Sequence, residues 1–158
     1  MRITDTLGKD AEKKIKEWLD RPEEGYDFSR LPDQMTGFYG SSNICDFHLY
    51  KYPYHYWIES KATWADRFDF SMLTETQHDG LLAKSKINGV HSYVAVLFAS
   101  YKRAFLIDIR DIKKLEDNNK HSLNILKIDK WDIPYLEIKT VPNNRKKLLD
   151  YDKVDNVL

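Results

Sequence analysis

Two runs of β-forming residues joined by a short turn constrain the fold of this chain more than any other feature. Residues 44–51 and 56–63 are rich in aromatic and branched side chains, and the segment YPYH (52–55) separates them. Two such runs around a proline-containing turn are typical of a β-hairpin. The sequence therefore predicts two antiparallel strands, and the charged residues inside them need an explanation.

Side-chain alternation predicts where those charges lie. The apolar and small residues fall at odd positions of the first strand (45–49) and at even positions of the second (58–62). Opposed residues of an antiparallel pair share a face, so a common core face requires odd residues to oppose even ones. This register places Asp46 on the other face, across from Glu59 or Lys61, with cross-strand neighbours about 5 Å apart.

Two carboxylates beside a lysine suit a metal site. Hard carboxylate oxygens are ligands for Mg²⁺ or Mn²⁺, and two close acidic groups repel unless they are protonated or paired. Lys61 can neutralise the pair or polarise an attacking water. Magnesium takes further ligands from substrate phosphates, so the cluster indicates phosphodiester chemistry. The alternative interpretation is ordinary surface charge on a solvated strand.

An acidic residue two positions before a lysine recurs in the chain, so this spacing alone is not specific. Glu137 and Lys139 are the strongest competitor, because they also lie in a strand candidate and have Asp129 and Asp132 upstream. However, Pro134 interrupts any partner strand, and a polar tail follows instead of a helix. We interpret this second motif as solvated surface.

Periodicity along the rest of the chain predicts a mixed α/β domain. An amphipathic helix is expected near the N-terminus, with Asp5 or Thr6 as its cap and Arg21-Pro22 as its stop. The other expected elements are a loop at 21–43, a helix at about 74–87, a buried strand at 93–99, a strand at 104–109, a short helix capped by Asp111, and weaker strands at 123–128 and 135–141. The order αββαββ with an appendage suggests a mixed sheet flanked by helices.

Composition indicates one domain. The 158 residues, 42% of them hydrophobic, suffice for a single core, and 25 basic residues balance 25 acidic ones, so an anionic partner must be met by a local patch. Cys45 is the single cysteine, which excludes an intrachain disulfide, and no signal peptide or membrane helix is evident. We expect an intracellular domain spanning residues 1–158, with its core at about 5–110 and a C-terminal appendage at about 111–158.

The order of elements and charges resembles the PD-(D/E)xK nuclease core, in which a helix, an Asp-bearing strand, a Glu-x-Lys strand, a helix and a buried strand follow one another. Here Asp46 is followed after twelve residues by Glu59-Ser60-Lys61. More narrowly, the segments SSNICDF, YWIESKAT and FDFSMLTETQHDGLLAKSKINGVHSYVAVLF are similar to RecU-type Holliday junction resolvases. The resemblance implies a restriction-endonuclease-like αβββαβ core and Mg²⁺-dependent cleavage of branched DNA.

The resemblance also implies roles for individual residues. Mg²⁺, for which Mn²⁺ can substitute, would be bound by Asp46, Glu59 and the backbone carbonyl of Ser60. Lys61 would lie near the attacking water.

The resemblance implies a role at the site for two further residues, and each also has an ordinary structural interpretation. Glu12 is implied as an additional metal-site carboxylate, or else it forms an ordinary i,i+4 pair with Lys16. Gln77 matches the glutamine of the family's second helix, or else it belongs to a Thr74-x-x-Gln77 capping box.

The hairpin itself offers two open questions. The aromatic segment YKYPYHYW (50–57) can contact nucleic acid or pack against a partner chain. His48 shares the predicted face of Asp46 and is either a ligand or a surface histidine.

The expected partner is DNA, most specifically a four-way junction. The candidate phosphate contacts are basic residues expected near the metal face: Lys9, Lys13, Arg30, Lys84 and Lys86. Two symmetric cuts need two active sites, so a homodimer is expected, in the cytoplasm of a bacterial cell or phage-infected host and away from membranes. The alternatives are a sequence-specific restriction- or homing-type endonuclease and a non-catalytic DNA-binding module.

Overall fold

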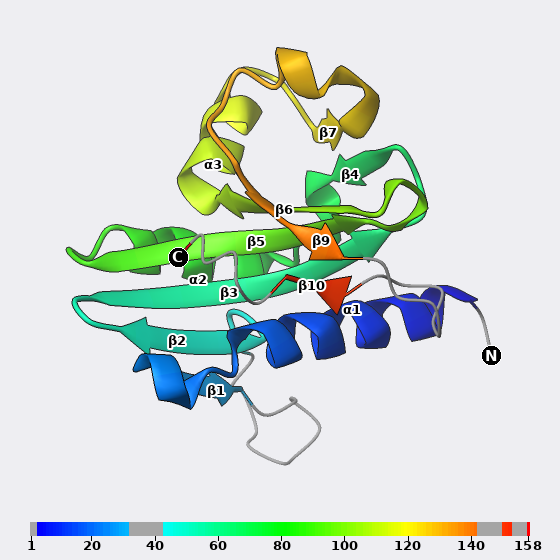
Figure 1. Ribbon diagram of the computed structural model, residues 1–158. Coiled ribbons are helices and arrows are strands. Elements are labelled where there is room, and N and C mark those ends of the chain that lie inside the picture. The colour runs from blue at the N-terminus through cyan, green and yellow to red at the C-terminus, as the bar shows by residue number, and fades with distance from the viewer. Residues whose placement is uncertain (1–2, 32–42, 142–149, 153–157) are drawn as a thin grey trace.

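The computed structural model describes residues 3–31, 43–141, 150–152 and 158. Its elements are α1 (Ile3–Leu19), β1 (Asp27–Arg30), β2 (Phe47–Lys51), β3 (Tyr54–Thr63), β4 (Arg67–Asp69), α2 (Glu75–Ser85), β5 (Val90–Phe98), β6 (Arg103–Asp108), α3 (Ile109–Asp117), β7 (Ser122–Asn124), β8 (Leu136–Ile138), β9 (Thr140–Val141) and β10 (Asp150–Tyr151) (Figure 1). Short 3₁₀ helices occur at Pro22–Glu24, Phe70–Met72, Ala99–Tyr101 and Ile125–Lys130.

A six-stranded mixed sheet forms the centre of the molecule. Its strand order is β1-β2-β3-β5-β6-β8, in which β3 and β5 are parallel and the other neighbours are antiparallel. Parallel neighbours need a crossover, and the segment through β4 and α2 supplies it. The predicted class, one α/β domain with a mixed sheet flanked by helices, is confirmed.

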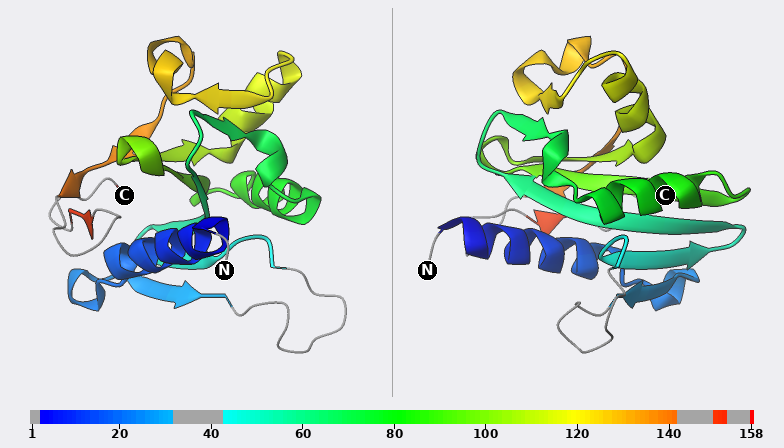
Figure 2. Two further views of the ribbon diagram at one scale, coloured as in Figure 1. Left: turned by 90° about the vertical axis from the view of Figure 1, so that its right-hand side faces the viewer. Right: turned by 180° about the vertical axis from the view of Figure 1, so that it is seen from behind.

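Helices cover both faces of the sheet (Figures 1 and 2). On one face α1 buries Leu7, Ala11 and Ile15, spaced four residues apart as an amphipathic helix requires. On the other face a second core contains Leu81 of α2 and Ile112 of α3. The intervening strand β5 is buried on both faces, as its continuous apolar sequence predicts. None of the described helices is long and apolar enough to cross a membrane.

The hairpin register agrees with the prediction from alternation. In β2 and β3, Phe47 opposes Ile58 and Leu49 opposes Tyr56, so odd residues face even ones, and these side chains point into the α1 core. Extending the register one residue past Phe47 sets Asp46 opposite Glu59. The turn is shorter than predicted, because β3 already begins at Tyr54.

The N-terminal boundaries differ from the prediction. The first helix begins at Ile3, so Asp5 and Thr6 lie inside it and do not cap it. The predicted loop 21–43 contains β1, which pairs with β2; residues 32–42 of that loop lie outside the described residues. Four residues carry too little periodicity to mark a strand, and β1 forms because β2 offers it a free edge.

The C-terminal half contains three further corrections. Asp108, not Asp111, caps α3, because its carboxylate accepts a hydrogen bond from the Arg110 N–H. The predicted strand 123–128 is mostly a 3₁₀ helix, and 135–141 divides into β8 and β9. Weak strand patterns of this kind depend on whether a sheet edge is available, which short-range sequence does not report.

Candidate metal-dependent nuclease site

Asp46, Glu59 and Lys61 meet where β2 begins beside the middle of β3. The Ser60 N–H donates a hydrogen bond to Asp46 Oδ2 over 3.0 Å, and Lys61 Nζ lies 3.4 Å from Glu59 Oε1. The pairing partners of Glu59 and Lys61 on β5 are Val94 and Val96, which belong to the α2–α3 core. The three charged groups therefore assemble on the face of the sheet that α2 covers.

The main chain before β2 is fixed on two sides, and this sets the position of Asp46. The Asp46 carbonyl accepts a hydrogen bond from the Leu31 N–H over 2.8 Å, which continues the β1–β2 ladder. Ile44 packs directly onto α2 at Gly80, where the helix carries no side chain. The neighbouring Cys45 is buried as predicted but packs in the α2–α3 core, because β2 starts only after it. Burial raises the pKa of the Cys45 thiol to about 12, which favours the neutral thiol.

Substituting Gly80 by alanine is expected to destabilise the protein. A Cβ there would lie 2.2 Å from Ile44 Cγ2 and 2.7 Å from Ile44 Cβ, so the segment before Asp46 must move. We expect a loss of about 1–3 kcal/mol in the free energy of unfolding, despite the helix propensity of alanine. Chemical denaturation measures it.

Gly8→Ala is the matched control, because nothing lies within 4 Å of a Cβ at Gly8 of α1. It should raise stability by about 0.5–1 kcal/mol. Equal effects of the two substitutions would show that Ile44 does not hold the segment against α2.

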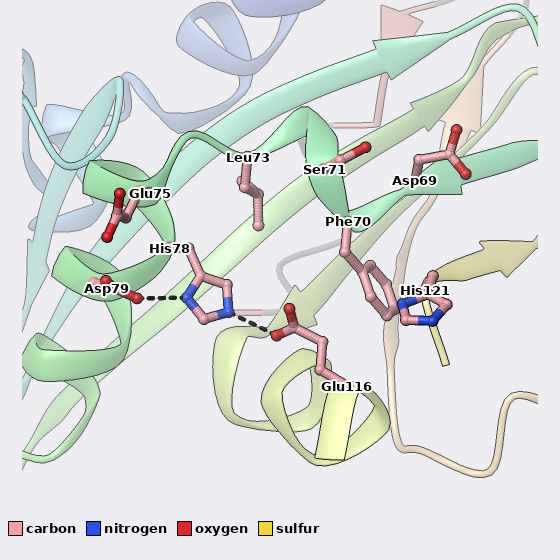
Figure 3. Close-up of a pocket in the computed structure, with 9 residues that line it drawn as sticks. All are labelled: Asp69, Phe70, Ser71, Leu73, Glu75, His78, Asp79, Glu116 and His121. Carbon is pink, nitrogen blue, oxygen red and sulfur yellow. Dashed lines mark hydrogen bonds and ion pairs between the residues drawn. The ribbon is translucent and has the colours of Figure 1, made fainter. Parts of the chain in front are cut away.

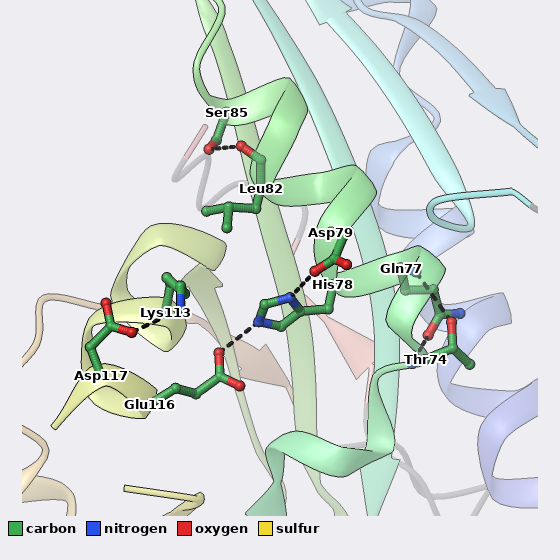
Figure 4. Close-up of polar contacts among 9 residues, drawn as sticks. All are labelled: Thr74, Gln77, His78, Asp79, Leu82, Ser85, Lys113, Glu116 and Asp117. Atoms are coloured by element: carbon green, nitrogen blue, oxygen red, sulfur yellow. Dashed lines mark hydrogen bonds and ion pairs between the residues drawn. The ribbon is translucent and has the colours of Figure 1, made fainter. Parts of the chain in front are cut away.

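Gln77 forms the predicted capping box and also contacts Glu59, while its functional role stays a prediction. Its Oε1 accepts a hydrogen bond from the Thr74 N–H and its own N–H donates to Thr74 Oγ1, which completes a capping box (Figure 4). Its Nε2 donates to Glu59 Oε1 over 3.0 Å. One amide therefore starts α2 with its oxygen and holds Glu59 with its nitrogen.

The Glu59 carboxyl is in an unusual electrostatic environment. It is 3% exposed, and desolvation together with the neighbouring Asp46 carboxylate raises its pKa to about 8, although Lys61 opposes the shift. Gln77 and Lys61 both approach Oε1, whereas no hydrogen-bond donor among the described residues reaches the buried Oε2; the carboxyl groups of Glu59 and Asp46 are close enough to share a proton. An orphaned carboxylate oxygen is costly unless a proton or a cation occupies it.

The donor set fits a hard divalent cation. In a β-strand, the N–H and C=O groups of any one residue point toward the same neighbouring strand. Because the Ser60 N–H points toward Asp46, the Ser60 carbonyl faces that side as well. Asp46, Glu59 Oε2 and this carbonyl are the oxygen ligands that Mg²⁺ accepts.

Glu12 of α1 contacts a basic residue of β1. It forms an ion pair with Arg30, whose pairing partner Phe47 faces the α1 core, on the side of the sheet opposite Glu59. In the described part of the chain, no three His, Cys, Asp or Glu side chains form a group that could hold a metal ion. The metal-site role that the resemblance implies for Glu12 therefore stays a prediction.

The other basic residues predicted to contact DNA phosphates are distributed over two helices. Lys9 and Lys13 are exposed on α1. On the opposite face, Lys84 Nζ lies 5.2 Å from the centre of the Trp57 ring, and Lys86 is the exposed C-terminal cap residue of α2.

Comparison with known proteins supports the fold. No protein-family model matches the chain, and no curated protein matches it either. A solved structure of Hjc from Archaeoglobus fulgidus, described as a Holliday junction resolvase from an archaeal hyperthermophile, superposes with a TM-score of 0.50. The match covers 74% of this chain and 88% of that one at 18% identity. This chain has a resolvase fold.

A cavity on the resolvase fold lies beside the first turn of α2 and was not foreseen from the sequence. It measures about 600 Å³, and Figure 3 shows its lining residues, which are Asp69, Phe70, Ser71, Leu73, Glu75, His78, Asp79, Glu116 and His121. None of Asp46, Glu59 and Lys61 lines it. We place the candidate site at those three residues, because the buried Glu59 carboxyl with its raised pKa lies there beside Asp46 and Lys61.

His78 joins α2 to α3 at the edge of this cavity. Its Nδ1 lies 2.8 Å from Asp79 Oδ1 and its Nε2 lies 2.6 Å from Glu116 Oε1, on the side of α2 away from Gln77 (Figure 4). Partial burial lowers the pKa of His78, but the two carboxylates outweigh it and the net pKa is raised. The contact joins residues 38 positions apart, so no local signal in the sequence indicates it.

The contribution of His78 to stability should decrease as pH rises. A raised pKa in the folded state stabilises the protein fully below the unfolded value of about 6.5, and this is lost as pH rises through the folded pKa. The melting temperature of His78→Gln should therefore fall below that of the parent at about pH 5.5 and approach it at high pH. A difference independent of pH would contradict the ion pair.

Proposed function

We propose that this protein is a Mg²⁺-dependent, structure-selective endodeoxyribonuclease that cuts branched DNA, in particular four-way junctions. The observation that carries the proposal is the buried Glu59 carboxyl beside Asp46 and Lys61, whose Oε2 is reached by no hydrogen-bond donor of the described residues. The resemblance to RecU-type resolvases and the fold shared with Hjc favour a junction over other DNA substrates.

In this proposal Asp46, Glu59 and the Ser60 carbonyl hold Mg²⁺, with Mn²⁺ as a substitute. Bound there, the ion supplies positive charge to the scissile phosphate and lowers the pKa of water. Gln77 would be a positioning residue, because its hydrogen bond to Oε1 orients the Glu59 carboxyl and leaves Oε2 available to bind the ion. Lys61 neutralises part of the carboxylate charge and stabilises the negative charge that develops on the phosphate.

A homodimer completes the proposal. Resolving a four-way junction requires cuts in two strands related by symmetry, and a two-fold dimer supplies two sites in that relation.

The test is cleavage of three substrates: a four-way junction, a linear duplex and single-stranded DNA, each with Mg²⁺ or EDTA. Paired symmetric nicks in the junction, dependent on Mg²⁺, are expected. Cutting of the linear duplex at one sequence would instead support a restriction- or homing-type enzyme. DNA binding without cleavage in Mg²⁺ or Mn²⁺ would refute both nuclease functions and support a non-catalytic DNA-binding module.

A further inference from the structure

Aromatic and imidazole side chains lie on the same face of the β2–β3 hairpin as the two carboxylates, between them and the turn. One row beyond Asp46, His48 lies opposite Trp57, and one row further Tyr50 lies opposite His55. Successive rows on one face of a hairpin are about 7 Å apart. We call His48, Tyr50, His55 and Trp57 the ring ladder, which begins one row from the candidate metal site.

The two imidazoles of the ring ladder lie edge to edge. His48 Nε2 and His55 Nδ1 are 3.1 Å apart, and the ring planes differ by 9°. Ring nitrogens form hydrogen bonds in the ring plane, so nearly parallel rings joined in this way are side by side. A neutral imidazole has one donor and one acceptor, and the pair uses one of each internally. Whichever tautomer is present, one outward N–H therefore remains for a ligand.

Neighbouring side chains hold this pair, and two opposite charges act on His48, the carboxylate of Asp27 and the ammonium group of Lys84. Trp57 packs on His48 with ring centres 4.4 Å apart, and Tyr50 packs on His55 at 4.6 Å. The ammonium group of Lys84 lies over the Trp57 ring, at a distance where cation–π attraction restrains it. The imidazole N–H groups and the Lys84 ammonium group have thus lost much of their conformational freedom before any ligand binds, which lowers the entropic cost of binding.

An ammonium group and an imidazole N–H beside a phosphodiester site match a second phosphate. We propose that the ring ladder and Lys84 hold a backbone phosphate of the cut DNA strand, next to the scissile phosphate. This proposal rests on the nuclease function proposed above. A metal ion is the other ligand that paired imidazoles suggest, but across residues 3–31, 43–141, 150–152 and 158 no third ligating side chain joins them.

Binding to a synthetic four-way junction in Ca²⁺, without Mg²⁺, tests the ring ladder. His55→Ala and Lys84→Ala should each weaken binding about tenfold, the loss expected for one hydrogen bond to a charged group. His55 is exposed, so its truncation should leave the melting temperature unchanged. His91→Ala is the matched control, since His91 also stacks on an aromatic ring, that of Tyr56, but on the opposite face of the sheet.

Replacing single phosphates of the cut strand by neutral methylphosphonates locates the contact. The parent should lose affinity at one phosphate flanking the cut, and His55→Ala should lose none there. The proposal is overturned if no position shows this dependence, or if the His91→Ala loss equals the His55→Ala loss. It is likewise overturned if the dependence of DNA affinity on His55 appears only when Zn²⁺ or Ni²⁺ is added. That result would make His48 and His55 a metal site.

The two proposals fail in different ways. A parent protein that does not cleave the junction in Mg²⁺ or Mn²⁺ refutes the nuclease function, whereas the methylphosphonate scan depends on binding alone. A parent that cleaves the junction, with His55→Ala and Lys84→Ala binding as tightly as His91→Ala, refutes the ring ladder alone.

Discussion

Glu59→Gln should reduce junction cleavage by roughly 10²–10⁴-fold, the range found when a charged group essential to the chemistry is removed. The amide keeps the shape of the side chain and an oxygen for Gln77 to contact, but it cannot supply the second anionic oxygen, which no donor of the described residues reaches. Single-turnover cleavage of the junction at saturating Mg²⁺ measures the loss.

The same substitution should change stability in a pH-dependent way. The pKa of Glu59 is raised to about 8 from an ordinary value of 4.5, so without metal the parent loses stability as pH rises through this window. Glu59→Gln should lack that loss. Because metal ligands must be deprotonated, Mg²⁺ should raise the melting temperature of the parent most above pH 8, and that of Glu59→Gln not at all.

Glu137→Gln is the matched control for Glu59→Gln. Glu137 also precedes a lysine by two positions and lies on a strand of the same sheet, but it is exposed and paired with Arg103. Cleavage by this variant should stay within twofold of the parent. If Glu59→Gln cleaves as fast as Glu137→Gln, the assignment of the site is wrong.

Lys61→Ala should reduce cleavage by roughly 10²–10³-fold while metal binding persists. The ammonium lies 3.4 Å from Glu59 Oε1, where it can counter charge that develops on a phosphate held by the carboxylates. Removing it also removes an interaction that lowers the Glu59 pKa, so the pH–rate profile should shift to higher pH.

Two measurements separate the role of Lys61 from a structural one. Mg²⁺ should still raise the melting temperature of Lys61→Ala at high pH, since the oxygen ligands are intact. Lys139→Ala, which removes an exposed lysine from the second Glu-x-Lys motif, should cleave as the parent does. A Lys61→Ala protein with normal cleavage would refute the proposed role.

Alternation alone was sufficient to bring the candidate residues together. The apolar residues of β2 and β3 require odd residues to oppose even ones, which puts Asp46 on the face of Glu59 and Lys61, and the structure sets it opposite Glu59. A shift by one residue would turn Phe47 and Leu49 out of the α1 core, where both are fully buried, so the hydrophobic pattern specifies the pairing strongly. The position of Gln77 likewise follows from its capping box.

Other parts of the site depend on contacts between distant residues. The strand β1 and the hydrogen bond from Leu31 to Asp46 form only once β2 exists as an edge. Gly80 is an ordinary helical residue by sequence, and its role is visible only because Ile44 occupies the space of the missing side chain. Glu12 illustrates the same limit, since its ion pair with Arg30 crosses from α1 to β1.

The sequence by itself determined the class of fold, the parity of the hairpin pairing and the common face of Asp46, Glu59 and Lys61, because strand alternation and core burial are local rules that act at every residue. Only the tertiary structure decided the exact register, the burial of Glu59 Oε2 away from every donor of the described residues, the contact of His78 between α2 and α3, and the hydrogen bond between two imidazoles beside Lys84. These properties depend on burial and on distances between side chains from different elements, which are set when the helices pack onto the sheet.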